Sequence, residues 1–120
     1  RIGAPQLDAL RRLLSDPRMQ KRTVVLLSHH GPIGLSGTLN RWHTELVDGV
    51  ALNQLAHEHH AVILHGHLHQ RLWHRAQHHH PHVIGGGSST ELGNEGYWTI
   101  DLDDHLTIEA RHLGFGRVEQ

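Results

Sequence analysis

The sequence predicts an α/β domain in which a strand-helix-strand unit is followed by antiparallel β hairpins. Two short apolar runs, 23–28 and 61–64, have the composition of buried parallel strands. A helix candidate separates them, and β-rich stretches with short connections follow. With 120 residues, 37% hydrophobic and only 4% aromatic content, the chain is one domain at most, with a modest aliphatic core.

The N-terminal stretch predicts an amphipathic helix. Pro5 lies near its first position, and Leu7, Leu10 and Leu14 fall on one stripe. The chain starts at Arg1 without an initiator methionine or signal-peptide character. We therefore expect it to be the later part of a longer protein.

The first predicted strand, 23–28, runs directly into His29 and His30. The helix candidate, 48–57, has Asp48 as its expected N-cap. A right-handed crossover through this helix would make the flanking strands parallel, so both would end at the same edge of the sheet. Open α/β sheets bind their ligands at that edge.

The second predicted strand ends in histidines spaced two apart, His65, His67 and His69. In extended backbone such side chains share a face, with Cα atoms about 6.6 Å apart. We expect His67 and His69 to hold one metal ion together, or one each of a pair about 3.5–4 Å apart. In a chain with 16 histidines, chance is a competing explanation for such a spacing. Two histidine clusters at one sheet edge favour a metal site.

The C-terminal third is expected to be β-rich. A strand over 70–75 is followed by a turn over 76–82, and a Gly-Ser segment at 85–89 permits a bend or a close approach to a ligand. Stretches 97–102 and 106–110 predict a hairpin.

Two further groups of histidines have structural explanations. The cluster within the 76–82 turn is interpreted as a solvated hairpin tip, because a catalytic site needs ligands held on rigid elements. His57, His59 and His60 end the predicted helix, where imidazoles favour the negative end of the dipole.

The two motifs at the sheet edge resemble those of a known family. Ser28-His29-His30-Gly31-Pro32 and Gly66-His67-Leu68-His69 look like the last two metal-binding motifs of the calcineurin-like metallophosphoesterases. General resemblance favours the bacterial cyclic-nucleotide phosphodiesterase-like branch. The resemblance implies a layered α/β/β/α sandwich, of which residues 1–120 form the C-terminal half. The family's DxH, GDxxD and GNH motifs have no counterpart here.

The resemblance also implies the ligands of two divalent ions, of manganese, iron or zinc. His29 and His67 would bind one ion, and His69 the other. His30 would support a ligand, or the registers of His29 and His30 would be exchanged. The loop before the helix is long enough to face a substrate. Its candidates for substrate contact are Arg41, Trp42 and His43.

The implied function is hydrolysis of a small-molecule phosphate monoester or diester. In the family, a metal-bridging hydroxide attacks phosphorus while both ions neutralise phosphoryl oxygens. The bridging carboxylate and the general acid belong to the motifs missing here, so no catalytic residue is visible and the chain alone is expected to be nearly inactive. The alternatives are a stand-alone histidine-rich metal-binding module and a noncatalytic phosphoesterase-like interaction domain.

Composition limits the remaining function classes. A formal net charge of −1 gives no attraction to nucleic acid or anionic membranes, and no run is long enough to span a bilayer. Because the chain has no cysteine, disulfides and thiolate ligands are excluded. Oligomeric state and compartment stay open.

Overall fold

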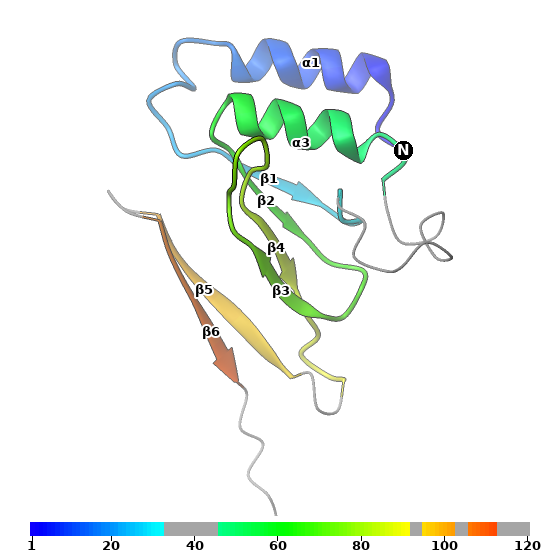
Figure 1. Cartoon of the computed structure of the whole chain (residues 1–120), viewed down its shortest axis with the longest axis vertical. Helices are drawn as coiled ribbons and strands as arrows, with labels where there is room; N and C mark the ends of the chain where they lie inside the picture. Colours follow the sequence, from blue (N-terminus) through cyan, green and yellow to red (C-terminus); the bar gives the residue numbers. More distant parts are fainter. Residues whose placement is uncertain (33–45, 92–94, 103–105, 113–120) are drawn as a thin grey trace, which may run out of the picture.

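The computed structural model describes residues 1–32, 46–91, 95–102 and 106–112. This part of the chain is mixed α/β, with a four-stranded mixed sheet and a separate antiparallel hairpin (Figure 1). The α/β class and the hairpin are therefore confirmed. The elements are α1 (Ala4–Leu14), β1 (Val25–Ser28), α3 (Gly49–Glu58), β2 (Val62–His65), β3 (Arg71–His74), β4 (Val83–Gly86), β5 (Gly96–Leu102) and β6 (Leu106–His112).

The four-stranded sheet has the order β1-β2-β4-β3. Strands β1 and β2 are parallel, with Ser28 opposite His65 at their carboxyl ends. Strand β4 is parallel to β2, and β3 is antiparallel to β4 at the far edge. The predicted strand-helix-strand unit is confirmed, and both histidine motifs leave the sheet at the same edge.

Strand β4 corrects the prediction of a Gly-Ser bend at 85–89. Gly85 and Gly86 belong to this strand, which lies between β2 and β3. A Cβ atom at Gly85 would lie 2.8 Å from Leu72 Cγ and 2.9 Å from the Gln70 carbonyl oxygen. The glycine therefore permits close packing of neighbouring strands, which sequence composition alone does not distinguish from a bend.

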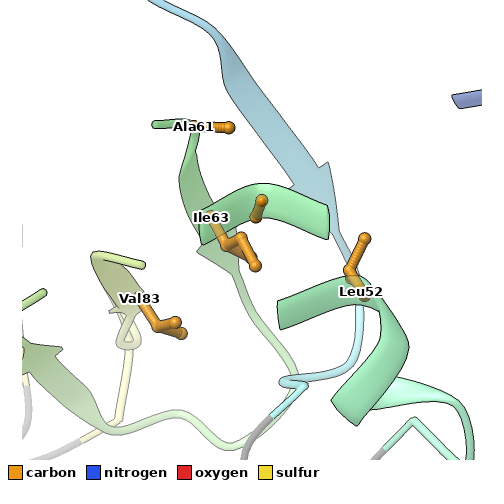
Figure 2. Packing of buried hydrophobic residues seen from close by; sticks show 5 residues of the cluster. Leu52, Ala61, Ile63 and Val83 are labelled. Carbon is orange, nitrogen blue, oxygen red and sulfur yellow. The ribbon is translucent and has the colours of Figure 1, made fainter. Parts of the chain in front are cut away.

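The core lies between the sheet and α3. Leu52 of α3 packs with Ile63 of β2 and Val83 of β4, as Figure 2 shows, and all three side chains are at most 3% exposed. Leu7 and Leu10 of α1 add partly buried contacts to the same cluster. Full burial of one such aliphatic side chain contributes about 1.5–3 kcal/mol. Helices α1 and α3 run side by side above the sheet (Figure 1).

The β5-β6 hairpin contacts the four-stranded sheet through Trp98. Its Nε1–H donates to the Gly85 carbonyl at 2.8 Å, and its ring meets Trp73 edge-on at 6.4 Å between centroids. The connection at 103–105 lies outside the described residues. At the other side of the sheet, β1 is the edge strand of the described part, and its Leu27 is 80% exposed.

Asp48 is the N-cap residue of α3, as predicted, but its side chain does not cap that helix. Its carboxylate accepts hydrogen bonds from the backbone N–H groups of Ile2, at 3.0 Å, and Gly3, at 2.7 Å. The bond from Ile2 is the main reason that the pKa of this carboxyl is lowered. Asp48 therefore ties the start of α1 to the start of α3.

We expect Asp48→Ala to lower the free energy of unfolding by about 1–2 kcal/mol at neutral pH, since two backbone donors lose a charged but partly solvated acceptor. Because the folded-state pKa is lowered, this stabilisation is present above the ordinary pKa of an aspartate and is lost as pH falls through the lowered value. Urea unfolding followed by circular dichroism measures the effect. Asp8→Ala is the control, because Asp8 forms an exposed ion pair with Arg11 and its loss should change stability by less than about 0.5 kcal/mol.

The hydrogen bonds at the carboxyl end of α3 explain the position and backbone conformation of His60. The His60 N–H donates to the His57 carbonyl at 3.1 Å and the Ala61 N–H to the Ala56 carbonyl at 2.8 Å. With φ +52° at His60, this is a Schellman motif, which leads the chain from the helix into β2. A structural explanation is thus sufficient for this histidine. Neither helix of the described residues is long and apolar enough to cross a membrane.

The turn between β3 and β4 confirms the hairpin-tip interpretation, since residues 76–80 are exposed. His82, at the base of this turn, is different. Its Nδ1 accepts hydrogen bonds from Trp73 Nε1–H at 3.1 Å and from the Ala76 N–H at 3.2 Å. Burial, and to a smaller extent the charge of Arg75, lowers the pKa of His82. Protonation at Nδ1 would abolish both hydrogen bonds.

His82 should therefore make stability fall with acid. A histidine with a lowered folded-state pKa leaves stability intact above its ordinary pKa of about 6.5, and stability falls as pH drops from there through the lowered value. We expect the Tm of wild type to fall more between pH 7.5 and 5.5 than that of His82→Asn. Asparagine keeps an acceptor, Oδ1, at the position of Nδ1 and does not titrate. Equal losses of Tm would contradict this assignment.

Candidate metal centre

The loop after β1 presents His29 and His30 on a fixed backbone. The Ser28 hydroxyl donates to the His30 carbonyl at 2.7 Å, which closes a local turn. The Gly66 N–H donates to the His29 carbonyl at 3.2 Å, so this loop is also joined to the one after β2. The loop continues to Pro32, which is buried and accepts a weak hydrogen bond from Asn53 of α3 at 3.4 Å.

The loop after β2 departs from the predicted extended backbone. Strand β2 ends at His65, and φ is +67° at His67 and +52° at His69. The Leu68 N–H donates to the Gly66 carbonyl at 2.9 Å, so His67 is the central residue of a three-residue γ-turn. The expectation that these histidines alternate along an extended strand is therefore wrong. Positive φ at a residue other than glycine costs roughly 1–3 kcal/mol, and such strain gathers at functional sites.

These two loops bring three histidines together. His29, His30 and His67 each offer a ring nitrogen, and the three nitrogens lie within 4.8 Å of one another. His29 Nε2 and His67 Nδ1 are 3.1 Å apart. The ring centroids of His30 and His67 are 4.4 Å apart. The convergence of the two motifs at the sheet edge agrees with the sequence prediction.

The donor set fits a divalent metal ion. Nitrogens bound at about 2.0–2.1 Å in tetrahedral geometry are about 3.3–3.4 Å apart. The ring nitrogens of His29 and His67 already have nearly this spacing, whereas a separation at the 4.8 Å limit of the group would need to shorten by more than an ångström. His29 and His67 lie at the surface, where rotation of the imidazole rings would shorten the wider separation. Three imidazoles suit zinc, copper and nickel better than manganese, which prefers oxygen ligands.

Burial and neighbouring charge favour the neutral form of the His30 imidazole. Burial is the main cause that lowers the pKa of His30, and the charges of His67 and His29 lower it further. Neutral imidazole is the form that binds metal, through its unprotonated nitrogen. His30 thus enters the group as a direct candidate ligand, a role that sequence reasoning left undecided between His29 and His30.

His69 does not belong to this group of three. Its Nδ1 lies 3.5 Å from Glu91 Oε2, and both side chains are largely exposed. Ser88 holds Glu91 in place, because its hydroxyl accepts the N–H groups of Thr90 at 3.2 Å and Glu91 at 3.0 Å. Sequence reasoning missed Glu91. The spacing Ser88-x-x-Glu91 is a local capping pattern that could have indicated a fixed glutamate.

The remaining predicted site residues are the candidates for substrate contact, Arg41, Trp42 and His43. They are outside the described residues. His65, the first of the three histidines spaced two apart, is only 4% exposed.

Comparison with models of known protein families gave no match, and comparison with curated proteins gave no related sequence. The resemblance to the calcineurin-like metallophosphoesterases therefore stays a prediction. What the structure adds is the group of three histidines.

Proposed function

We propose that this chain supplies the imidazole ligands of a divalent metal centre that hydrolyses phosphate esters. One observation carries the proposal: two motifs 38 residues apart in sequence place His29 and His67 within 3.1 Å of each other, with His30 beside them. The phosphoesterase chemistry comes from the resemblance of both motifs to those of the metallophosphoesterases. A bound divalent ion would act as a Lewis acid on a phosphoryl oxygen and lower the pKa of a bound water.

The residues of the chain contribute binding and orientation. His29, His30 and His67 would hold one ion through their unprotonated ring nitrogens. Two of these side chains are exposed, so the ion would be open to a phosphate from solvent. For the second ion of the proposal, His69 would provide a nitrogen, and Glu91, 3.5 Å away, would provide a carboxylate or orient the imidazole.

Turnover of bis(p-nitrophenyl) phosphate by the protein at its natural length tests this function. We expect hydrolysis that depends on added manganese or cobalt and is lost in both His67→Ala and His69→Ala. His79→Ala, at the exposed hairpin tip, is the control and should keep full turnover. Unchanged turnover in both site variants would refute the site.

A metal-binding module without hydrolysis is the second candidate. The observation that favours it is that the group of three described ligands consists of imidazoles alone. It predicts stoichiometric zinc or nickel binding by the wild-type protein without release of p-nitrophenol. Binding with no turnover at natural length would select this candidate over the hydrolase.

A further inference from the structure

The buried histidine at the end of β2 has a role that neither motif assigns to it. His65 is 4% exposed, whereas His67 and His69 on the same loop are exposed. It lies opposite Ser28 of β1 and Gly85 of β4, where the two histidine loops leave the sheet. Histidine is an unusual choice for a buried strand position, since its ring carries two polar nitrogens that need partners.

One of these nitrogens has a partner in the γ-turn. His65 Nδ1 is 3.0 Å from the Gly66 carbonyl oxygen, which also accepts the Leu68 N–H at 2.9 Å. The hydrogen bond from the Leu68 N–H to this carbonyl closes the γ-turn around His67. The carbonyl therefore receives two donors if the proton of the His65 ring is on Nδ1.

The surroundings of His65 Nε2 favour the tautomer that carries the proton on Nδ1. His65 Nε2 is enclosed and has no hydrogen-bond partner among the described residues. A proton there would be a buried donor without an acceptor, while the Nδ1 lone pair would face a carbonyl oxygen. When Nδ1 carries the proton, the lone pair no longer faces the carbonyl oxygen, and Nε2 is left as an unpaired acceptor instead of an unpaired N–H donor. The geometry thus assigns a neutral Nδ1–H imidazole to His65.

The same ring also supports the neighbouring loop. A Cβ atom at Gly31 would lie 3.0 Å from His65 Cε1 and 3.2 Å from its Nδ1, so the ring fits directly against this glycine. On the other side of the turn, the Gly66 N–H donates to the His29 carbonyl at 3.2 Å. His65 thus contacts the backbone of both loops that carry the candidate ligands.

We propose that His65 is a positioning residue, which holds the strained turn of His67 through the Gly66 carbonyl and supports the His29 loop through Gly31. This inference rests on the proposed metal centre. His65 binds no metal itself, because its free nitrogen is enclosed. Its contribution is to keep His67 near His29 before the metal arrives, as outer hydrogen-bond partners of metal ligands do.

A matched pair of variants tests the hydrogen bond. Asparagine and leucine have nearly the same shape, but only asparagine places an N–H donor where Nδ1 lies. We expect His65→Asn to keep the Kd for cobalt, measured from visible absorption, within about threefold of wild type. His65→Leu should raise the Kd about 10–100-fold, the usual effect of losing an outer partner. Ile84→Val, a core change on β4, should lower Tm without changing the Kd.

Three outcomes would overturn the proposal. Wild-type affinity in His65→Leu would show that the donor is dispensable, and equal weakening in both variants would show that ring volume matters instead of the hydrogen bond. Nitrogen-15 NMR of the wild-type imidazoles gives the third test, which stands even if His65→Leu does not fold: an Nε2–H tautomer contradicts the assignment. Failure of the wild-type chain to bind cobalt would refute the metal centre, and the tautomer would still decide whether His65 fastens the turn.

Discussion

Replacing His67 with glycine is expected to raise the Kd for zinc or cobalt by more than about a hundredfold while making the fold more stable. The loss should exceed the 10–100-fold effect of removing an outer partner, because one of three candidate ligands disappears. The gain in stability, about 1 kcal/mol, follows because glycine adopts the positive φ of +67° without the steric cost that histidine bears. Isothermal titration and urea unfolding measure the two effects.

The control for this variant is the same substitution at another histidine with positive φ. His78 has φ +44° and lies at the exposed tip of the β3-β4 hairpin. His78→Gly should relieve similar strain and leave the Kd unchanged. If both variants bind metal like wild type, His67 is not a ligand. If both bind equally weakly, the metal is not held at the sheet edge.

Gly49→Ala is expected to destabilise the fold by about 1–2 kcal/mol and to weaken metal binding as well. A Cβ atom at this first residue of α3 would collide with the Pro32 carbonyl oxygen and lie 2.9 Å from the Pro32 Cα. Overpacking against backbone costs about 1–3 kcal/mol or more, which exceeds the gain of at most about 1 kcal/mol from the higher helix propensity of alanine. Pro32 follows closely after His29 and His30 in the chain, so its displacement reaches the candidate ligands.

Val50→Ala is the matched control for this prediction. Val50 is the next residue of α3 after Gly49. Its side chain is 80% exposed, so truncation should change stability by less than about 0.5 kcal/mol. Urea midpoints and cobalt titrations of the two variants give the comparison. A Gly49→Ala protein as stable as Val50→Ala would mean that the helix and the loop move apart without cost.

Local patterns predicted the strands and helices because each depends on neighbouring residues. The apolar run before His65 and the leucine stripe of α1 both identify their elements directly. The place of β4 between β2 and β3 could not be predicted in this way. It depends on pairing between distant segments, and the two glycines at its end are also typical of a bend.

The candidate site was predictable to the extent that parallel strands end at one edge. That rule brings the two histidine clusters to the same edge, and the resemblance to the metallophosphoesterases supplied the pairing of His29 with His67, which lie 3.1 Å apart between ring nitrogens. The resemblance assigns His69 to a second ion, but the backbone conformation that separates it from the other histidines was not predictable, because the period of two holds only in extended backbone and φ is positive at His67. The presence of a histidine at position 67 does not by itself predict a positive φ. The role of His65 depends on the same turn, so it too required the structure.

The outer edge of β1 has a consequence for how the protein behaves in solution. Within the described residues this edge has no strand partner, and its Leu27 is 80% exposed. Unpaired edges with apolar side chains invite association between sheets of separate molecules, which proteins often oppose with lysine. Leu27→Lys is therefore a rational change for concentrated samples. Any strand that paired there in parallel would also end beside His29, so self-association would crowd the candidate metal site.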